Sequence, residues 1–136
     1  MPWTTNILVI ANRTVDSVEL RETLRSRALA GPIRVTLVAP AEAGRVPTAR
    51  RLEQAVERLA EQDIIAVGIV GHADPLVAVE EVWDPRRFDE VIVATLPTDV
   101  SRWMTFDLPR RIERLTGALV THVVAGAGRA LLRTYA

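Results

Sequence analysis

Short apolar runs rich in β-branched residues alternate with longer amphipathic segments along this chain. That alternation constrains the fold more than any other feature, because runs of 4–8 such residues are typical of strands and segments with helical spacing of apolar residues are typical of helices. The expected strands are 7–11, 33–38, 64–70, 90–94 and 119–124. The expected helices are 16–27, 49–62, 76–83 and 107–115. Strands that alternate with helices form a parallel sheet covered on both faces.

This pattern predicts a single α/β domain with a doubly wound, five-stranded parallel sheet in the order 3-2-1-4-5. The 136 residues are enough for one core and not for two. We expect residues 1–5 to be an N-terminal extension and residues 6–124 to form the domain. Residues 125–136 form a tail that either frays or packs as a small appendage.

Charge and composition exclude several classes of function. The 17 basic and 17 acidic residues balance, so nothing in the net charge favours nucleic acid, and the absence of cysteine removes disulfides, thiolate nucleophiles and cysteine metal sites. The chain has no apolar run long enough to span a membrane and no secretory signal at its start, so we expect a soluble, cytoplasmic protein. Every basic residue is arginine, which indicates a codon bias and weakens any single arginine as a sign of a site.

The sheet order predicts where a ligand would bind. In doubly wound sheets the ligand crevice lies beyond the carboxyl ends of the strands at which the winding direction reverses, here the first and the fourth. Polar side chains follow both strands and are the candidate ligand-binding residues: Asn12, Thr14, Thr95, Ser101, Arg102 and Asp107. Trp103 lies in the same segment and could stack on a base.

Each of these residues could have a structural role in place of a ligand-binding one. Asn12 suits the turn at a strand end, and Thr14 suits a cap of the first helix. Asp107 is better explained as the N-cap of the helix that contains Pro109. Trp103 is better explained as a lid on the end of the sheet, with Arg102 in solvent.

The two histidines do not indicate a metal site. His72 stands in the turn after the third strand, close to Asp74, which suits the N-cap of the helix that begins with Pro75. His122 lies inside the fifth strand, where it lines an interface or a helix contact.

Four segments of the chain together resemble a universal stress protein domain. They are NILVIAN, VGIVGHADPLVAV, DEVIVATLP and LVTHVVA, and the likeness covers residues 6–124, with a similarity to arginine-rich members from actinobacteria. The resemblance implies the adenine nucleotide α-hydrolase-like fold, a role in a stress response and a homodimer. Some members of the family bind ATP, with an Asp at the end of strand 1 and the pattern Gly-x2-Gly-x9-Gly-Ser/Thr after strand 4.

The positions that match this ATP motif carry other residues here. Asn12 replaces the Asp, and the later positions hold Ala94, Pro97, Phe106 and Asp107, with a spacer one residue shorter. Proline and phenylalanine deny the positive φ and the close backbone approach that glycine allows. We therefore expect no ATP and no other cofactor.

These observations lead to one favoured function and one alternative. The favoured function is a non-catalytic, dimeric regulatory or binding protein of the universal stress type. The alternative is a binder of a nucleoside, a nucleoside monophosphate or a small anion in the crevice. An adenylating enzyme of the wider group is disfavoured, because the chain has no Ser-Gly-Gly loop and no His-x-Gly-His signature.

The dimer is expected to form through the fifth strand, taken as the edge of the sheet, because an edge strand leaves backbone groups free to pair. The residues expected in that interface are Val120, His122, Val123 and Val124.

Overall fold

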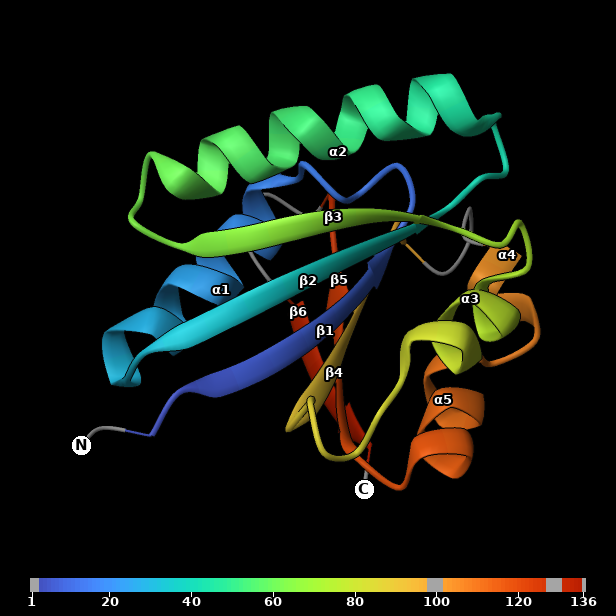
Figure 1. The fold of residues 1–136 in the computed structure, drawn as a ribbon. Coiled ribbons are helices and arrows are strands. Elements are labelled where there is room, and N and C mark those ends of the chain that lie inside the picture. Colours follow the sequence, from blue (N-terminus) through green and yellow to red (C-terminus); the bar gives the residue numbers. More distant parts are fainter. Residues whose placement is uncertain (1–2, 98–101, 127–130, 136) are drawn as a thin grey trace.

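The computed structural model describes residues 3–97, 102–126 and 131–135 and has one mixed sheet with helices on both faces (Figure 1). The strands are β1 (Thr5–Ala11), β2 (Ile33–Pro40), β3 (Ile65–Gly71), β4 (Glu90–Thr95), β5 (Leu119–Val124) and β6 (Leu131–Tyr135). The helices are α1 (Val18–Ala30), α2 (Arg45–Ala60), α3 (Pro75–Val82), α4 (Arg102–Thr105) and α5 (Leu108–Thr116).

The sheet has the order β3-β2-β1-β4-β5-β6. β1 pairs in parallel with β2 on one side and with β4 on the other, so the winding reverses between β1 and β4 as the sequence predicts. The α/β class and the order of the first five strands are confirmed.

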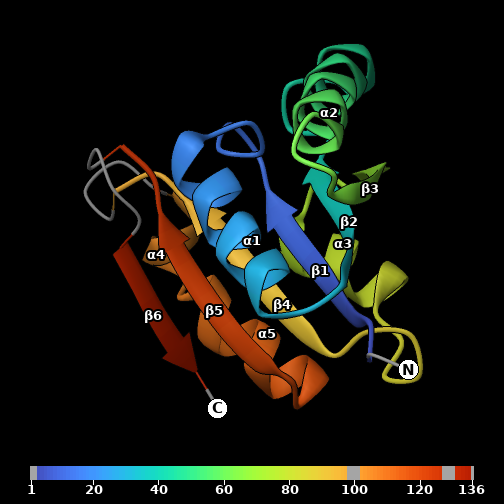
Figure 2. The ribbon, with the colours of Figure 1, turned by 90° about the vertical axis from the view of Figure 1, so that its left-hand side faces the viewer.

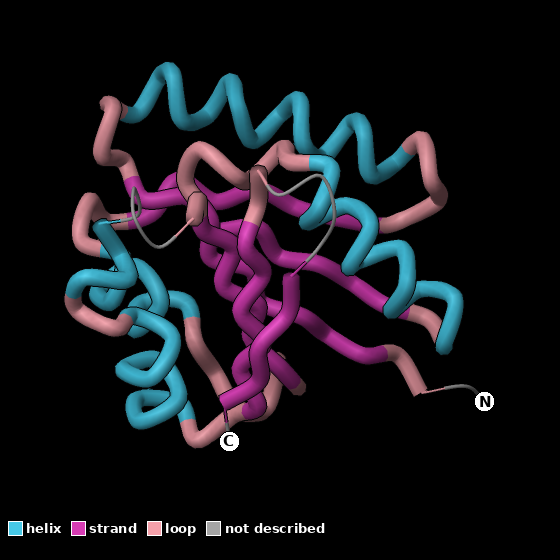
Figure 3. The backbone as a smooth tube through the Cα atoms, turned by 180° about the vertical axis from the view of Figure 1, so that it is seen from behind, coloured by secondary structure: helices cyan, strands magenta, loops and turns pink. Residues whose placement is uncertain are grey.

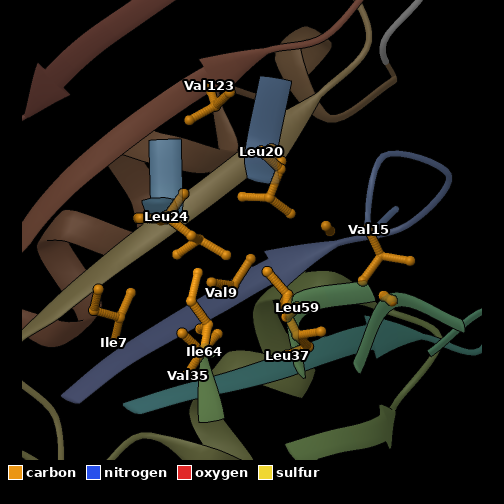
Figure 4. Packing of buried hydrophobic residues seen from close by; sticks show 14 of the residues in the cluster. Ile7, Val9, Val15, Leu20, Leu24, Val35, Leu37, Leu59, Ile64 and Val123 are labelled. Atoms are coloured by element: carbon orange, nitrogen blue, oxygen red, sulfur yellow. The ribbon is translucent and has the colours of Figure 1, made fainter. Parts of the chain in front are cut away.

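The two helical layers cover opposite faces of the sheet (Figures 2 and 3). α1 and α2 pack on one face, where Leu20, Leu24 and Leu59 contact the side of β1 that carries Ile7 and Val9 (Figure 4). α3, α4 and α5 pack on the other face against Leu8, Ile10, Val91 and Val93. Both faces of β1 and β4 are buried, which explains why these strands are apolar without alternation.

The prediction of a five-stranded, all-parallel sheet was wrong, because the tail supplies a sixth strand. β6 runs antiparallel to β5, from Val120 opposite Tyr135 to Val124 opposite Leu131. Tyr135 is buried in the same core as α5, and the guanidinium carbon of Arg110 lies 5.7 Å from the centre of its ring. The five residues of β6 are too few to show a clear period, so the sequence left this segment undecided.

The sixth strand removes the premise of the expected dimer interface. β5 lies between β4 and β6 and is not an edge strand. The side chains of Val120, His122 and Val123 are buried within the chain, and that of Val124 is half-buried. A homodimer stays a prediction, but β5 does not offer the free backbone edge on which that prediction rested.

Several helix boundaries differ from the predicted ones. α1 begins after Ser17, whose hydroxyl accepts a hydrogen bond from the Leu20 amide at 3.2 Å. α2 begins at Arg45 and includes Pro47, which the sequence suggested was still in a loop. Proline is tolerated in a first helical turn, because amides there have no acceptor within the helix. The short helix α4 was not predicted.

Among the described residues, no helix combines the length and the apolar character needed to cross a bilayer.

Candidate functional site

A cavity of about 290 Å³ lies where the carboxyl ends of β1, β2 and β4 meet. Its walls come from the segments after these three strands, from α2 and from α4. The lining residues are Asn12, Arg13, Thr14, Glu42, Ala43, Arg51, Ala94, Thr95, Leu96, Arg102 and Trp103. The cavity therefore occupies the switch point of the sheet, where ligands bind in folds of this class.

The structure brings four of the six candidate residues together. Asn12, Thr14, Thr95 and Arg102 all line the cavity. Asp107 is not among the lining residues, and Ser101 lies outside the described residues.

Thr14 connects the two strands that form the crevice. Its hydroxyl donates a buried hydrogen bond of 2.7 Å to the carbonyl of Ala94, at the end of β4. Thr14 does not cap α1, because Ser17 does so. The hydroxyl of Thr14 therefore fixes the distance between the two walls.

Glu42 is the centre of a polar network among the residues that line the cavity. Its carboxylate accepts a hydrogen bond from Asn12 Nδ2 at 2.5 Å and another from Trp103 Nε1 at 3.2 Å. Asn12 Oδ1 in turn accepts from Arg51 at 3.4 Å, and this fixes the orientation of the amide. The network links α2, β1, the loop after β2 and α4.

Trp103 is held over the end of the sheet, as the lid interpretation predicts, and is 6% exposed. Arg102, its neighbour, is exposed to solvent. Trp103 and Glu42 also line a second cavity of about 510 Å³, whose other walls include Pro75, Leu76 and Phe106. The hydrogen bond between the indole and the carboxylate therefore lies between two adjacent cavities.

Arginine dominates the charge of the first cavity. Arg13, Arg51 and Arg102 reach it from three separate segments, against the single carboxylate of Glu42. Within the described part of the chain, none of these three arginines forms an ion pair. Three lining arginines against one lining carboxylate give the cavity a positive charge balance, which favours an anion.

The side chain of Thr95 is turned inward. Its hydroxyl lies 2.6 Å from His122 Nε2, and both side chains are buried. Burial lowers the pKa of His122, the positive charge of Arg133 lowers it further, and the carboxylate of Asp107 opposes both effects. His122 therefore has a structural partner inside the chain.

Asp107 occupies the N-cap position of α5 as predicted, but its side chain makes no capping hydrogen bond. The residue has a left-handed backbone with a φ of 52°, and its carboxylate pairs with Arg110 at 3.1 Å. In the described chain only Asp63 and Asp107 combine a side chain with a positive φ. The position of the ATP motif's last glycine, which Phe106 occupies, therefore does not have a positive φ in this chain, and the next residue, Asp107, does.

His72 has the structural role that its loop position predicts. Its Nδ1 accepts a hydrogen bond of 2.9 Å from the Asp74 amide, and Asp74 caps α3 through the amides of Leu76 and Val77. Over the described ranges, no group of three or more potential metal ligands is present.

Two charged lining residues, Glu42 and Arg51, lie outside the segments after the first and fourth strands, where the sequence placed the crevice. Glu42 follows β2, and β2 lies beside β1, so its position after a strand next to the switch point was a usable signal. Arg51 lies in the first half of α2, where nothing in the local pattern separates it from the solvent-exposed Arg50.

No protein-family model matches this chain, and no curated protein matches its sequence. The likeness to universal stress proteins therefore stays a prediction from the residues quoted above.

Proposed function

We propose that this chain is a non-catalytic binding protein that takes a small phosphorylated anion in the cavity between β1 and β4. The observation that carries the proposal is that three arginines, Arg13, Arg51 and Arg102, line a cavity whose lining holds a single carboxylate, that of Glu42. One guanidinium group can donate two parallel hydrogen bonds to two oxygens of the same phosphate. It is also less strongly hydrated than an ammonium group, so it loses less when it leaves water.

The size of the cavity supports a small ligand. Its volume of about 290 Å³ lies at the lower end of the range of small-molecule sites. A phosphate or a compact phosphate ester fits such a volume. A bulkier group on the ester would extend into the second cavity past Trp103, which lines both.

A binding role is favoured over catalysis by the state of the two hydroxyls. Thr14 donates to the Ala94 carbonyl and Thr95 pairs with His122, so each already has a partner within the fold. Both threonines are 3% exposed, which leaves neither hydroxyl open to a substrate.

Two features of the cavity and its surroundings act against ATP as the ligand. Pro97 stands where the ATP motif requires a glycine, and Glu42 places a carboxylate in the cavity wall. Asp107 does not line the cavity, so its charge contributes little to excluding a triphosphate.

The test is thermal unfolding with four probes: inorganic phosphate, adenosine monophosphate, adenosine and Mg·ATP. A ligand that binds only the native state at about 100 times its Kd adds roughly 2.7 kcal/mol, which raises Tm by several degrees. We expect phosphate and the monophosphate to raise Tm, and adenosine and Mg·ATP to leave it unchanged.

Two variants locate the effect. Arg13→Gln and Arg51→Gln each remove one lining arginine and are expected to weaken phosphate binding at least tenfold. Arg25→Gln removes an exposed arginine of α1, changes the net charge equally and should bind as the wild type does. Equal binding by all three variants, or no response to phosphate at millimolar concentration, would contradict the proposal.

A further inference from the structure

β3 is an edge strand without the usual protection against pairing with another strand. It pairs with β2 from Ile65 to Gly71, and its other side faces no strand within the described parts of the chain. Its sequence, IAVGIVG, contains no charged residue and no proline. β6, at the opposite edge, carries Arg133. Charges, prolines and bulges are the common means by which proteins block edge-to-edge association, and β3 has neither a charge nor a proline.

One face of β3 also exposes an apolar stripe. Ile65, Val67 and Ile69 alternate along the strand and are 62%, 55% and 37% exposed. They lie on the face away from α2, since a Cβ placed on Gly68 would be 3.1 Å from Leu52 Cβ of that helix. A free backbone edge and an exposed β-branched stripe thus occur on the same strand.

α2 borders this edge on the other face of the sheet. A groove between α2 and β3 is lined by Ala49, Glu53, Val56, Glu57 and Val70, together with Leu52 and Gly68. Glu53 and Glu57 are exposed at the groove. The outer side of α2 would therefore take part in any contact made along β3.

Apart from Arg58, the exposed positive and negative charges of α2 lie in different halves of the helix. Its first half carries Arg45 and Arg50, both exposed, and its second half carries Glu53 and Glu57. The helix dipole does not account for this arrangement, because Arg45 in the first turn and Glu57 in the last turn oppose the dipole and only Arg58 in the last turn suits it.

The two other arginines of α2 have partners within the chain, although the side chain of Arg58 is 53% exposed. Arg51 donates to Asn12, and Arg58 lies 3.5 Å from an oxygen of Asp16. The outer side of α2 is thus positive in its first half and negative in its second.

We propose that β3 is the interface of a homodimer, in which the β3 strands of two copies pair antiparallel about a twofold axis. Such an axis places the first half of α2 beside the second half of α2 from the other copy, so Arg50 approaches Glu57. Charge complementarity therefore selects a second copy of this chain as the partner.

The same axis places the apolar stripe of one copy beside the apolar stripe of the other. With Gly68 at the axis, Val67 of each copy stands opposite Ile69 of the other, and cross-strand pairs of β-branched residues stabilise a sheet. A twofold contact of this kind is closed, because each copy uses its only β3 edge. The product is a dimer with a continuous twelve-stranded sheet and not a fibre.

Sedimentation equilibrium of the full chain tests the interface. We expect a dimer at micromolar concentration, and we expect Val67→Lys to raise its dissociation constant at least tenfold. Leu132→Lys is the matched control, because Leu132 is 54% exposed on β6 at the other edge, and this variant should remain dimeric. A monomeric wild type at several hundred micromolar, or a dimer lost in Leu132→Lys and retained in Val67→Lys, would overturn the proposal.

A charge exchange tests the orientation of the two copies. Arg50→Glu and Glu57→Arg are each expected to weaken the dimer, because like charges then meet across the axis. The variant with both substitutions restores opposite charges and should regain most of the affinity. If the double variant is no better than the weaker single variant, the antiparallel arrangement of α2 is wrong. Circular dichroism of each variant separates loss of pairing from loss of fold.

Discussion

The hydroxyl oxygen of Thr95 and Nε2 of His122 lie 2.6 Å apart between the end of β4 and the middle of β5. Both side chains are buried, on the face of the sheet that α5 covers. Burial lowers the pKa of His122, and Arg133, which stands opposite it on β6, lowers it further. The tail strand thus influences the protonation of a residue in the core.

The lowered pKa predicts that the protein loses stability in mild acid. Below about pH 6.5 the unfolded chain binds a proton at this histidine more readily than the folded protein does. The free energy of unfolding should therefore fall as the pH is lowered from about 7.5 through the unfolded-state pKa near 6.5, by at most about 1.4 kcal/mol per pH unit from this group. Urea unfolding across that range measures the slope.

Two substitutions assign that slope to His122. His122→Gln removes the titrating group and should flatten the slope. Arg133→Gln removes a nearby positive charge and should reduce the slope partly. An unchanged slope in His122→Gln would show that another group is responsible.

Thr14 is expected to stabilise the crevice through its hydrogen bond to the Ala94 carbonyl. Thr14→Val keeps the shape of the side chain but removes the donor, and should lower the free energy of unfolding by about 1–3 kcal/mol. Thr14→Ser keeps the donor and should cost less than Thr14→Val. Equal losses in the two variants would mean that packing of the methyl group, and not the hydrogen bond, is what matters.

Asn12 occupies the position at which ATP-binding universal stress proteins, the family that this chain resembles, have an aspartate. Its amide donates to Glu42 at 2.5 Å, so Asn12→Asp would place two carboxylates in contact. With Arg51 offsetting part of the repulsion, we expect a loss of about 1–2 kcal/mol at pH 7. Adding Glu42→Gln should recover most of that loss, and chemical unfolding of the single and double variants measures it. A double variant as unstable as Asn12→Asp would exclude repulsion as the cause.

The left-handed backbone of Asp107 predicts how the stability of the protein depends on the residue at position 107. Glycine adopts a φ of 52° without strain, aspartate tolerates it, and alanine does so at a cost. Asp107→Gly and Asp107→Ala both remove the exposed pair with Arg110, so the difference between them reports the backbone alone. We expect the glycine variant to be more stable than the alanine variant by about 1–2 kcal/mol in thermal unfolding. Equal stability would indicate that the turn relaxes.

Sequence predicted the fold better than it predicted the site. The strands near Val9 and Ile92 are recognisable because they are buried on both faces, and burial leaves a continuous apolar run in the sequence. The location of the crevice followed from the strand order. The pairing of Glu42 with Trp103 did not, because these residues are 61 positions apart and nothing local encodes their contact.

Local chemistry by itself determined which segments form the five parallel strands and which residues stand at the ends of β1 and β4, because those choices depend on hydrophobic period and turn residues. Tertiary structure alone decided three features. It placed β6 beside β5 and so set Arg133 opposite His122, it brought Arg13, Arg51 and Arg102 to one cavity, and it left β3 as an exposed apolar edge. Each of these depends on which distant segments meet, and the free energy of such contacts comes from burial and charge in the assembled fold, not from any property of the segment itself.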